Sequence, residues 1–428
     1  MDAFLVTGPS RLSGSVSISG AKNAALPALT ASLLTAEPVL LAGLPRVADI
    51  ATMTRLLASM GVVHHGDAPS TVTLRAHAIS STEAPYEVVR TMRAAILVLG
   101  PLVARFGEGR VSLPGGCAIG VRPVDLHLKA LEAMGARIAV EQGYIHAHVS
   151  RVGALGGRLS GADIAFPQVT VTGTENVLMA ACLARGTTRI TNAAVEPEVT
   201  DLANLLVSMG ASIEGIGTAT LVIEGREKLS GTGDRAHRVL PDRIEAGTYL
   251  AAAAITGGDV LAKNARGEDL RAFLDALKAA GATVTESVEG VRVSVDGPLA
   301  PVDLATAPHP GFPTDLQAQL LALMTRASGT SRISETIFEN RFLHVSELVR
   351  LGADVRIEGN TAVVTGPSRL QGAPVTASDL RASAALVLAA LAAEGETLIR
   401  RIYHLDRGYD AMETKLKSLG ANVERVNG

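Results

Sequence analysis

Apolar residues recur along the chain in a pattern that repeats six times. In each copy a leucine stands four residues before a glycine, and another apolar residue directly precedes that glycine. In the third copy the apolar positions follow the spacing i, i+3, i+4, i+7, which marks one face of a helix; they are Leu202, Leu205, Leu206 and Met209. The glycine predicts the end of that helix, and the β-branched residue soon after it predicts a strand. The six glycines, 68 to 75 residues apart, are Gly61, Gly135, Gly210, Gly281, Gly352 and Gly420.

Each copy also contains an earlier helix that is rich in alanine. A short strand that begins near a glycine usually follows it, as in GTTRITNA, GTSRISET and GETLIRRI. The order strand, helix, strand, loop, helix, strand, strand therefore occurs six times. Six units of about 70 residues are too many for one compact core, so we predict two α/β domains of three units each. The alanine-rich helices are expected at 21–34, 88–99, 174–184, 242–255, 312–324 and 379–392.

The heptapeptide VTGPSRL occurs twice, at 6–12 and at 364–370. The second copy lies where a repeat begins with a strand, and the sequence after Gly420 stops where another such strand should follow. We therefore predict that the first copy crosses to complete the C-terminal domain. The predicted domains are residues 21–231, and residues 1–20 together with 232–428.

Composition excludes several classes of function. The formal net charge of −3 argues against nucleic acid or an anionic membrane as the main partner, so an anion site needs a local arginine and lysine cluster. No segment reaches the roughly 20 apolar residues of a membrane span, and the first residues lack the basic region of a signal peptide. The two cysteines and the histidines show no spacing for a disulfide framework or a metal. We expect a cytoplasmic protein with neither metal nor cofactor.

The segment LPGGCAIGVRPVDLH, at 113–127, contains the most informative chemistry. Glycines and a proline around Cys117 predict a mobile loop, and Pro123 suits the first turn of a helix. A thiol five residues from Arg122 at a helix start is typical of a reactive group beside an anion site, but an incidental exposed cysteine explains the local sequence equally well. Cys182, in MAACLARG, is interpreted as a small core residue.

Polar residues also stand at the starts of other predicted helices, where a plain repeat needs none. Each one alone is better explained as a helix cap or a solvated side chain. Their recurrence at one place in the repeat predicts that they gather at one end of each domain and form a basic cleft for an anionic substrate. They are Lys22, Asn23, Arg93, Asp242, Arg243, Asp315, Asp379 and Arg381, with Glu196, Glu198, Glu339, Arg341, Asp406 and Arg407 in a second set of loops.

These motifs resemble one known family over essentially the whole chain. SGAKNAALP, TMRAAI, PGGCAIGVRPVDLH, EPE, TAPHPGFPTD, FENRF, DLRAS and YHLDRGY are similar to the UDP-N-acetylglucosamine 1-carboxyvinyltransferase family of enolpyruvyl transferases. The resemblance implies a two-domain inside-out α/β barrel that closes around its substrates. It implies transfer of the enolpyruvyl group of phosphoenolpyruvate to the 3′-hydroxyl of UDP-N-acetylglucosamine with release of phosphate, the first committed step of peptidoglycan synthesis.

The resemblance also implies roles for individual residues. Cys117 would be the acid, would form an adduct with phosphoenolpyruvate and would be alkylated by fosfomycin; Asp315 would be the base and bind the sugar, and Lys22 and Arg407 would share in catalysis. Phosphoenolpyruvate contacts would be Lys22, Asn23, Arg122, Arg341, Arg381 and Arg407. Nucleotide-sugar contacts would be Arg93, Arg122, Pro123, Val124, Asp125, Leu126, Thr170, Asp315 and Ile337.

One position departs from the family pattern, and two alternatives stay open. Some members have a lysine where this chain has Gln168, so a contact to the diphosphate is weakened or replaced, with Thr170 still available. The sister enzyme 5-enolpyruvylshikimate-3-phosphate synthase shares the fold and the donor but lacks the loop cysteine. A non-catalytic nucleotide-sugar-binding paralogue should have lost Cys117, Lys22 or Asp315, and all three are present.

Overall fold

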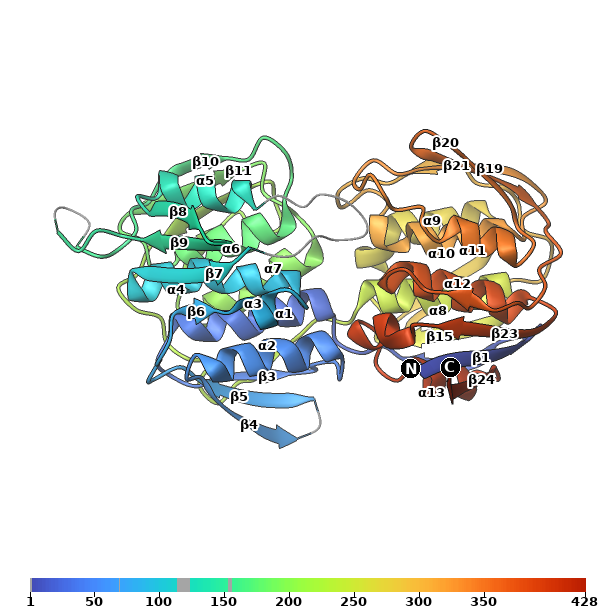
Figure 1. Ribbon diagram of the computed structural model, residues 1–428, viewed down its shortest axis with the longest axis horizontal. Helices are drawn as coiled ribbons and strands as arrows, with labels where there is room; N and C mark the ends of the chain where they lie inside the picture. Colours follow the sequence, from blue (N-terminus) through green and yellow to red (C-terminus); the bar gives the residue numbers. More distant parts are fainter. Residues whose placement is uncertain (1, 69, 114–123, 153–155) are drawn as a thin grey trace. The chain divides into compact units, whose positions relative to one another are not determined.

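The computed structural model describes residues 2–68, 70–113, 124–152 and 156–428. The chain divides into two compact units. The C-terminal unit contains residues 2–19 and 241–428, and the N-terminal unit contains the described residues between 20 and 240. Both chain termini therefore belong to the same unit (Figure 1).

Each unit contains three four-stranded sheets that follow one plan. A parallel edge strand pairs with the strand that comes after a buried helix, and the other two strands are antiparallel to their neighbours. The sheets of the N-terminal unit have the strand orders β14(His237–Arg238)-β3(Val39–Ala42)-β5(Thr71–Arg75)-β4(Val63–Ala68), β6(Glu83–Ala84)-β7(Glu108–Ser112)-β9(Tyr144–His148)-β8(Arg137–Glu141) and β10(Asp163–Ala165)-β11(Thr187–Thr191)-β13(Thr220–Glu224)-β12(Ser212–Glu214). Those of the C-terminal unit are β22(Val375–Thr376)-β23(Gly395–Arg400)-β1(Asp2–Gly8)-β24(Asn422–Asn427), β16(Thr283–Ser287)-β17(Gly290–Ser294)-β15(Asp259–Lys263)-β2(Ser13–Ser17) and β18(Leu304–Ala305)-β19(Gly329–Ser334)-β21(Thr361–Gly366)-β20(Asp354–Glu358).

The alanine-rich helices form the core of each unit. α8 is buried along its length from Ile244 to Ile255, because alanine side chains let helices and sheets approach closely. Figure 1 shows α8, α10 and α12 between the sheets of the C-terminal unit. No helix among the described residues has the length and hydrophobicity needed to cross a membrane. The inner helices are α1 (Lys22–Ala31) with the 3₁₀ turn η1 (Ser32–Leu34), α4 (Leu99–Phe106), α6 (Val171–Ala181), α8 (Arg243–Ile255), α10 (Gln317–Met324) and α12 (Leu380–Ala392).

The six leucine-marked helices end as the apolar pattern predicts. Every one of the six glycines has a positive φ, between 92° and 102°. The residue after each glycine donates its N–H to the carbonyl of the marking leucine, for example Val62 to Leu57 at 3.0 Å. A left-handed glycine with this bond closes the helix and satisfies its last carbonyls. The helices are α2 (Ala48–Ser59), α5 (Asp125–Ala133), α7 (Pro197–Ser208), α9 (Arg271–Ala279) after the turn η3 (Gly267–Leu270), α11 (Val345–Arg350) and α13 (Met412–Ser418).

The helix predicted at 88–99 is wrong in detail. The chain forms a single helical turn, α3 (Tyr86–Val89), then an extended residue at Met92, and then the 3₁₀ helix η2 (Arg93–Val98), which leads into α4. β-Branched Val88, Val89 and Thr91 lose side-chain freedom in a helix, which favours an interruption here. As a result, Arg93 stands at the start of η2 and not inside a longer helix.

The N-terminal strand completes the C-terminal unit, which confirms the interpretation of the repeated heptapeptide. β1 lies antiparallel between β23 and β24, with Val6 opposite both Thr397 and Val423. The strand ends at Gly8, so only the first three residues of the heptapeptide belong to it. The second copy enters at the end of β21 in the same way, because that strand closes at Gly366.

A close backbone contact explains why both copies contain the same glycine. A Cβ on Gly8 would lie 2.6 Å from the Ala390 carbonyl oxygen in α12, and Ser10 donates its N–H to a carbonyl of that helix at 2.8 Å. Gly366 and Ser368 approach the end of α10 in the same way, with a Ser368 hydrogen bond of 2.7 Å. The turn thus satisfies helix carbonyls that a bulkier residue would cover.

Candidate active site

Three predicted residues meet in the C-terminal unit. Asp315 lies in the 3₁₀ turn η4 (Thr314–Leu316) that introduces α10. Arg341 donates from Nη2 to Asp315 Oδ1 at 2.7 Å, and Arg381 donates from Nη2 to Oδ2 at 2.7 Å. The side chains of Arg341 and Arg381 are only 4% and 7% exposed, and that of Asp315 is 27% exposed. One carboxylate therefore joins the turn before α10, the turn before α11 and the first turn of α12.

The two arginines determine the charge of Asp315. Burial alone would raise the pKa of this carboxyl, but Arg381 and Arg341 hold the pKa well below its ordinary value. Burial opposes the charge of Arg381, yet the neighbouring Asp315 raises the pKa of this guanidinium above its ordinary value. Asp315 does not cap a helix, since the N-cap residue is Pro313 for η4 and Leu316 for α10, and neither helix start has a side-chain cap. The capping explanation is thus excluded at this position.

Arg341 retains a donor that is available for an anion. Among the described residues, its buried Nη1 has no hydrogen-bond partner. The guanidinium lies 5.2 Å from the ring centroid of Phe338. A buried guanidinium N–H without a partner is costly, so this atom is a natural contact for a carboxylate or phosphate.

Arg407 and Ile337 lie in the same unit. Arg407 is half-buried at the end of the 3₁₀ helix η5 (Ile402–Arg407). Two residues later, the Tyr409 ring lies 6.0 Å from the guanidinium carbon of Arg381. Ile337, a predicted nucleotide-sugar contact, is 37% exposed.

Glu335 is a residue of this site that the sequence did not reveal. Its buried carboxylate accepts hydrogen bonds from Thr314 Oγ1 at 2.8 Å and from Thr306 Oγ1 at 2.9 Å. It also accepts the backbone N–H of Ile337 at 2.8 Å. Glu335 thus fixes the turn that presents Asp315. Its position directly after a strand was the only signal available.

The other acids at helix starts in this unit behave as caps. Asp379 Oδ1 accepts the backbone N–H groups of Arg381 and Ala382 at 2.9 and 3.0 Å. Asp242 accepts two backbone N–H groups at the start of α8. The cap at Asp379 fixes the first turn of α12, and this turn presents Arg381 toward Asp315.

The N-terminal unit contains the predicted Lys22 and Asn23. Lys22 is the first residue of α1, and its Nζ lies 3.0 Å from Asp49 Oδ2. The two side chains are 12% and 7% exposed, so this ion pair is largely shielded from water. Asn23 follows on the exposed side of the same turn. A lysine and an amide at a helix start form a suitable group for binding phosphate.

The predicted nucleotide-sugar residues of this unit lie at the starts of three helices. Arg93 is half-buried at the start of η2, and Val124, Asp125 and Leu126 lie at the start of α5. Thr170 caps α6, where its Oγ1 accepts the Gly173 N–H at 3.2 Å. Gln168 is exposed before this cap.

Three acids are buried behind these helix starts. Glu175, in α6, is 1% exposed, and Glu196 and Glu198 are buried at the start of α7. Burial, together with the negative charges of Glu198 and Glu196, raises the pKa of Glu175 well above its ordinary value. Burial and the neighbouring acids therefore favour the neutral form of Glu175. The sequence indicated Glu196 and Glu198 but not Glu175, which lies within an apolar stretch.

Cys117, Arg122 and Pro123 lie outside the described residues. Cys182 is fully buried in the N-terminal unit, and burial raises the pKa of its thiol to about 12, so its interpretation as a core residue is confirmed. Within the described ranges, no three His, Cys, Asp or Glu side chains are grouped to hold a metal ion.

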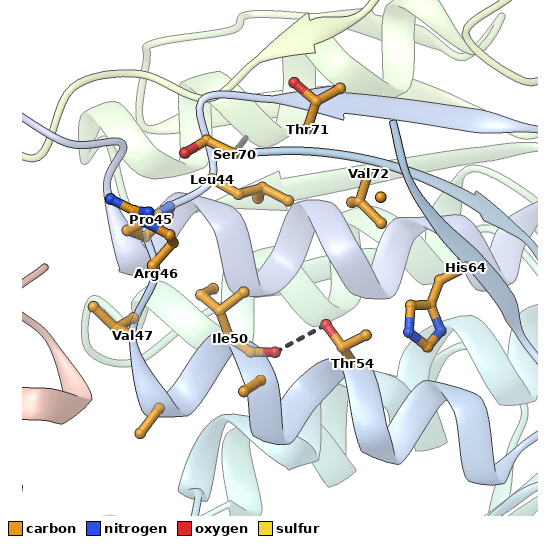
Figure 2. Close-up of a pocket in the computed structure, with 13 residues that line it drawn as sticks. Leu44, Pro45, Arg46, Val47, Ile50, Thr54, His64, Ser70, Thr71 and Val72 are labelled. Carbon is orange, nitrogen blue, oxygen red and sulfur yellow. Dashed lines mark hydrogen bonds between the residues drawn. The ribbon is translucent and has the colours of Figure 1, made fainter. Parts of the chain in front are cut away.

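A groove of about 500 Å³ lies elsewhere on the N-terminal unit, between α2 and the strands β4 and β5. Figure 2 shows Ile50 and Thr54 of α2 facing it, with His64 and Val72 on the strands. None of the predicted site residues lines this groove.

Comparisons with known proteins bear on the family and the fold of this chain. The family model for EPSP synthase (3-phosphoshikimate 1-carboxyvinyltransferase) matches residues 6–416. The UDP-N-acetylglucosamine 1-carboxyvinyltransferase of Psychrobacter sp. is 56% identical, covering 100% of this chain and 97% of the relative. That of Magnetococcus marinus is 55% identical, with complete coverage of both chains.

Solved structures show the same architecture. The enolpyruvyl transferase NikO from Streptomyces tendae superposes with a TM-score of 0.86 at 26% identity, covering 100% of this chain and 99% of that one. An EPSP synthase from Acinetobacter baumannii superposes over both complete chains with a TM-score of 0.75 at 18% identity, which concerns the fold alone. The prediction of an inside-out α/β barrel with six repeats is confirmed. The chain belongs to the enolpyruvyl transferase family and, within it, to the UDP-N-acetylglucosamine 1-carboxyvinyltransferases.

Proposed function

We propose that this protein transfers the enolpyruvyl group of phosphoenolpyruvate to the 3′-hydroxyl of UDP-N-acetylglucosamine and releases inorganic phosphate. The reaction is the first committed step of peptidoglycan synthesis and takes place in the cytoplasm. Full-length identity to two proteins of this name supports the assignment. The observation that carries it is the paired Arg341 and Arg381 around Asp315, because this cluster combines an anion site with a carboxylate.

Phosphoenolpyruvate has a phosphate and a carboxylate to bind. Arg341, Arg381 and Arg407 would contact these anions from the C-terminal unit, and Lys22, Asn23 and Arg122 from the N-terminal unit. The unpartnered Nη1 of Arg341 supports the first set. Guanidinium groups suit forked contacts to carboxylate or phosphate, and the Lys22 ammonium suits a point contact to phosphate.

The chemistry is an addition followed by an elimination. A proton is added to the methylene carbon of phosphoenolpyruvate, and the 3′-oxygen of the sugar attacks the adjacent carbon after losing its own proton. The resulting tetrahedral ketal expels phosphate and loses a proton from its methyl group, which restores the double bond. Cys117 would supply the first proton, and Asp315 would accept the proton of the hydroxyl.

The arginine pair constrains when Asp315 can act as a base. With Arg341 and Arg381 both bound to it, the carboxylate is ionised but weakly basic, because its pKa is held well below the ordinary value. Substrate anions that draw the guanidinium groups away would raise the pKa of Asp315. We therefore expect Asp315 to become an effective base only after phosphoenolpyruvate has bound.

The nucleotide sugar would occupy the helix starts of the N-terminal unit. Arg93, Thr170 and the segment 122–126 would contact it there, with Asp315 and Ile337 from the other unit. Thr170 already has its side chain at the first turn of α6, where backbone N–H groups favour a phosphate. Exposed Gln168 can donate a neutral hydrogen bond where some members place a lysine.

Phosphate release from phosphoenolpyruvate tests this function, with UDP-N-acetylglucosamine as acceptor in one sample and shikimate 3-phosphate in another. Release with the nucleotide sugar alone is expected. Release with shikimate 3-phosphate alone would indicate the sister enzyme, and none with either acceptor would indicate the non-catalytic paralogue.

Cys117→Ala provides the test of the proposed acid. The variant should nearly abolish turnover and leave UDP-N-acetylglucosamine binding largely intact. Peptide mapping after fosfomycin treatment should find the label on Cys117. Label on Cys182, or full activity of Cys117→Ala, would refute the role of this thiol.

A further inference from the structure

A buried amide connects several elements of the N-terminal unit. Asn176, in α6, is 1% exposed. Its Nδ2 donates to the Ile96 carbonyl oxygen at 3.0 Å and lies 3.0 Å from His127 Nδ1. Its Oδ1 accepts the backbone N–H of Gly100 at 2.6 Å. Both N–H groups and the oxygen of this amide are therefore used, and they join α6 to η2, α4 and α5.

The network fixes the tautomer of His127. This ring is 3% exposed, and burial lowers its pKa to about 4, so it is neutral at physiological pH. Because the Asn176 Nδ2 can only donate, His127 Nδ1 must accept and Nε2 holds the proton. Nε2 lies 3.3 Å from Thr172 Oγ1 in the first turn of α6, where it donates to the hydroxyl.

The backbone of α4 is adapted to this amide. A Cβ at Gly100 would overlap the side-chain oxygen and the carbonyl of Asn176. Glycine is otherwise unfavourable inside a helix. Its presence here indicates that the close approach between α4 and Asn176 is a specific feature of the unit.

The atoms of the network lie next to proposed contacts of the nucleotide sugar. Each contact is at most three residues from a network residue on the same element: Arg93 before Ile96, Leu126 before His127, and Thr170 before Thr172. A shift of any of these helix starts by a fraction of a helical turn would move the corresponding contact, and such small displacements are known to cost much of a site's effectiveness.

We propose that Asn176 and His127 are positioning residues that hold the starts of η2, α5 and α6 in register to bind the nucleotide sugar. The inference rests on the proposed function. Neither residue touches the substrate in this role. Their effect is larger on the affinity for UDP-N-acetylglucosamine than on the affinity for phosphoenolpyruvate, because Arg122 alone among the proposed phosphoenolpyruvate contacts is close in sequence to one of these helix starts.

A matched pair of variants tests the proposal. In His127→Asn the side-chain oxygen lies near the place of Nδ1 and can accept from Asn176, whereas His127→Leu removes the acceptor at similar volume. His127→Leu should raise the KM for UDP-N-acetylglucosamine on the order of tenfold and leave the KM for phosphoenolpyruvate within about twofold. His127→Asn should restore the first KM to within about threefold of the native protein.

The other outcomes overturn the proposal. An equal rise in both KM values, or no rescue by His127→Asn, would assign the network a merely structural role. If His127→Leu does not fold, Thr172→Val removes only the Nε2 partner; an unchanged KM for the nucleotide sugar in that variant would also refute positioning. If the native protein does not use the nucleotide sugar, the proposed function and this inference are overturned together. If the native protein is active but His127→Leu does not raise the KM for the nucleotide sugar more than the KM for phosphoenolpyruvate, the inference alone is overturned.

Discussion

Asn176 and Gln319 occupy the same position in two repeats, one in each unit, but their surroundings differ. Each lies ten residues before the glycine that leads into the next strand, Gly186 or Gly329. Asn176 has partners for both N–H groups and for its oxygen. Gln319 donates from Nε2, but its Oε1 has no partner among the described residues. The repeat thus places a buried amide at the same position in both units. Of these two amides, only that of Asn176 has hydrogen-bond partners among the described residues for all of its side-chain N–H and C=O groups.

The partners of Gln319 connect it to the arginine cluster. Its Nε2 lies 3.1 Å from Thr248 Oγ1 in α8 and 3.4 Å from the Tyr409 hydroxyl, and these two hydroxyls are 2.9 Å apart. Tyr409 in turn faces Arg381. A buried carbonyl oxygen without a partner costs about 1–3 kcal/mol. We infer that the Asn176 network fixes its helices more firmly than the Gln319 network does.

One acid in each unit has a displaced pKa, and the two displacements have opposite directions. Asp315 is partly exposed and held ionised by two arginines, whereas Glu175 is fully enclosed near two other acids, and its burial favours the neutral form. Both pKa values are displaced by their neighbours, downward for Asp315 and upward for Glu175. The scaffold repeats, but the charge of a carboxyl depends on what the adjacent loops supply.

Asp315→Asn should have the largest effect. Loss of the charge leaves Arg341 and Arg381 without a counter-ion, which should cost about 3 kcal/mol of stability and about 100-fold or more in turnover. The Asp315 contribution to stability is present above the ordinary carboxyl pKa and is lost as pH falls through the depressed pKa of the folded state. The free energies of unfolding of the native protein and the variant, measured by denaturation, should therefore converge as the pH becomes strongly acidic.

Asp296→Asn is the control, because this aspartate is exposed. It should leave stability and phosphate release essentially unchanged. If Asp315→Asn retained native turnover, the carboxylate would not be the base. If it melted like the control, the two arginine contacts would not stabilise the fold.

The sequence was sufficient for the scaffold because the scaffold depends on local chemistry repeated six times. A leucine, a second apolar residue and a glycine define the end of each leucine-marked helix. The structure places all six of these glycines in the left-handed region of φ. The strand completed by the N-terminus was predictable for the same reason. Gly8 and Gly366 show that even the identical heptapeptides have a local cause, a tight contact with helix carbonyls.

The site was less predictable because its supporting residues resemble core residues in sequence. Asn176 and Glu175 lie in an alanine-rich stretch, and nothing local distinguishes them from tolerated polar residues. Glu335 follows a strand and could equally face solvent. Their roles depend on partners 21 to 80 residues away, such as Thr314 for Glu335 and Ile96 for Asn176. Long-range pairing of this kind leaves no spacing to detect.

Asn176→Leu and Gln319→Leu test the difference between the two amides directly. The first change leaves the Gly100 N–H and His127 Nδ1 without their Asn176 partner and should cost about 3 kcal/mol. The second removes an amide whose oxygen is already unpartnered, so the loss should be nearer 1 kcal/mol. Denaturant unfolding of both variants, with hydrogen exchange to assign the affected unit, provides the measurement. Equal losses would show that Gln319 is as well satisfied as Asn176.

Glu175→Gln should have the smallest effect on stability. The pH dependence of this effect should be opposite in direction to that of Asp315→Asn. Because Glu175 is neutral in the folded protein, an uncharged amide of the same shape should fold normally at mildly acidic pH. A carboxyl whose pKa is raised by folding ionises more readily in the unfolded chain, so the native protein loses stability as pH rises above the ordinary value of 4.5. The variant cannot lose this contribution.

The melting temperature of Glu175→Gln should therefore gain on that of the native protein as pH rises from 5 to 8, by about 2 °C or more. The exposed Glu141→Gln is the matched control, and its difference from the native protein should stay constant over the same range. Parallel curves for Glu175→Gln would mean that Glu175 is ionised at neutral pH despite its burial. The contrast between an ionised Asp315 and a neutral Glu175 would then be lost.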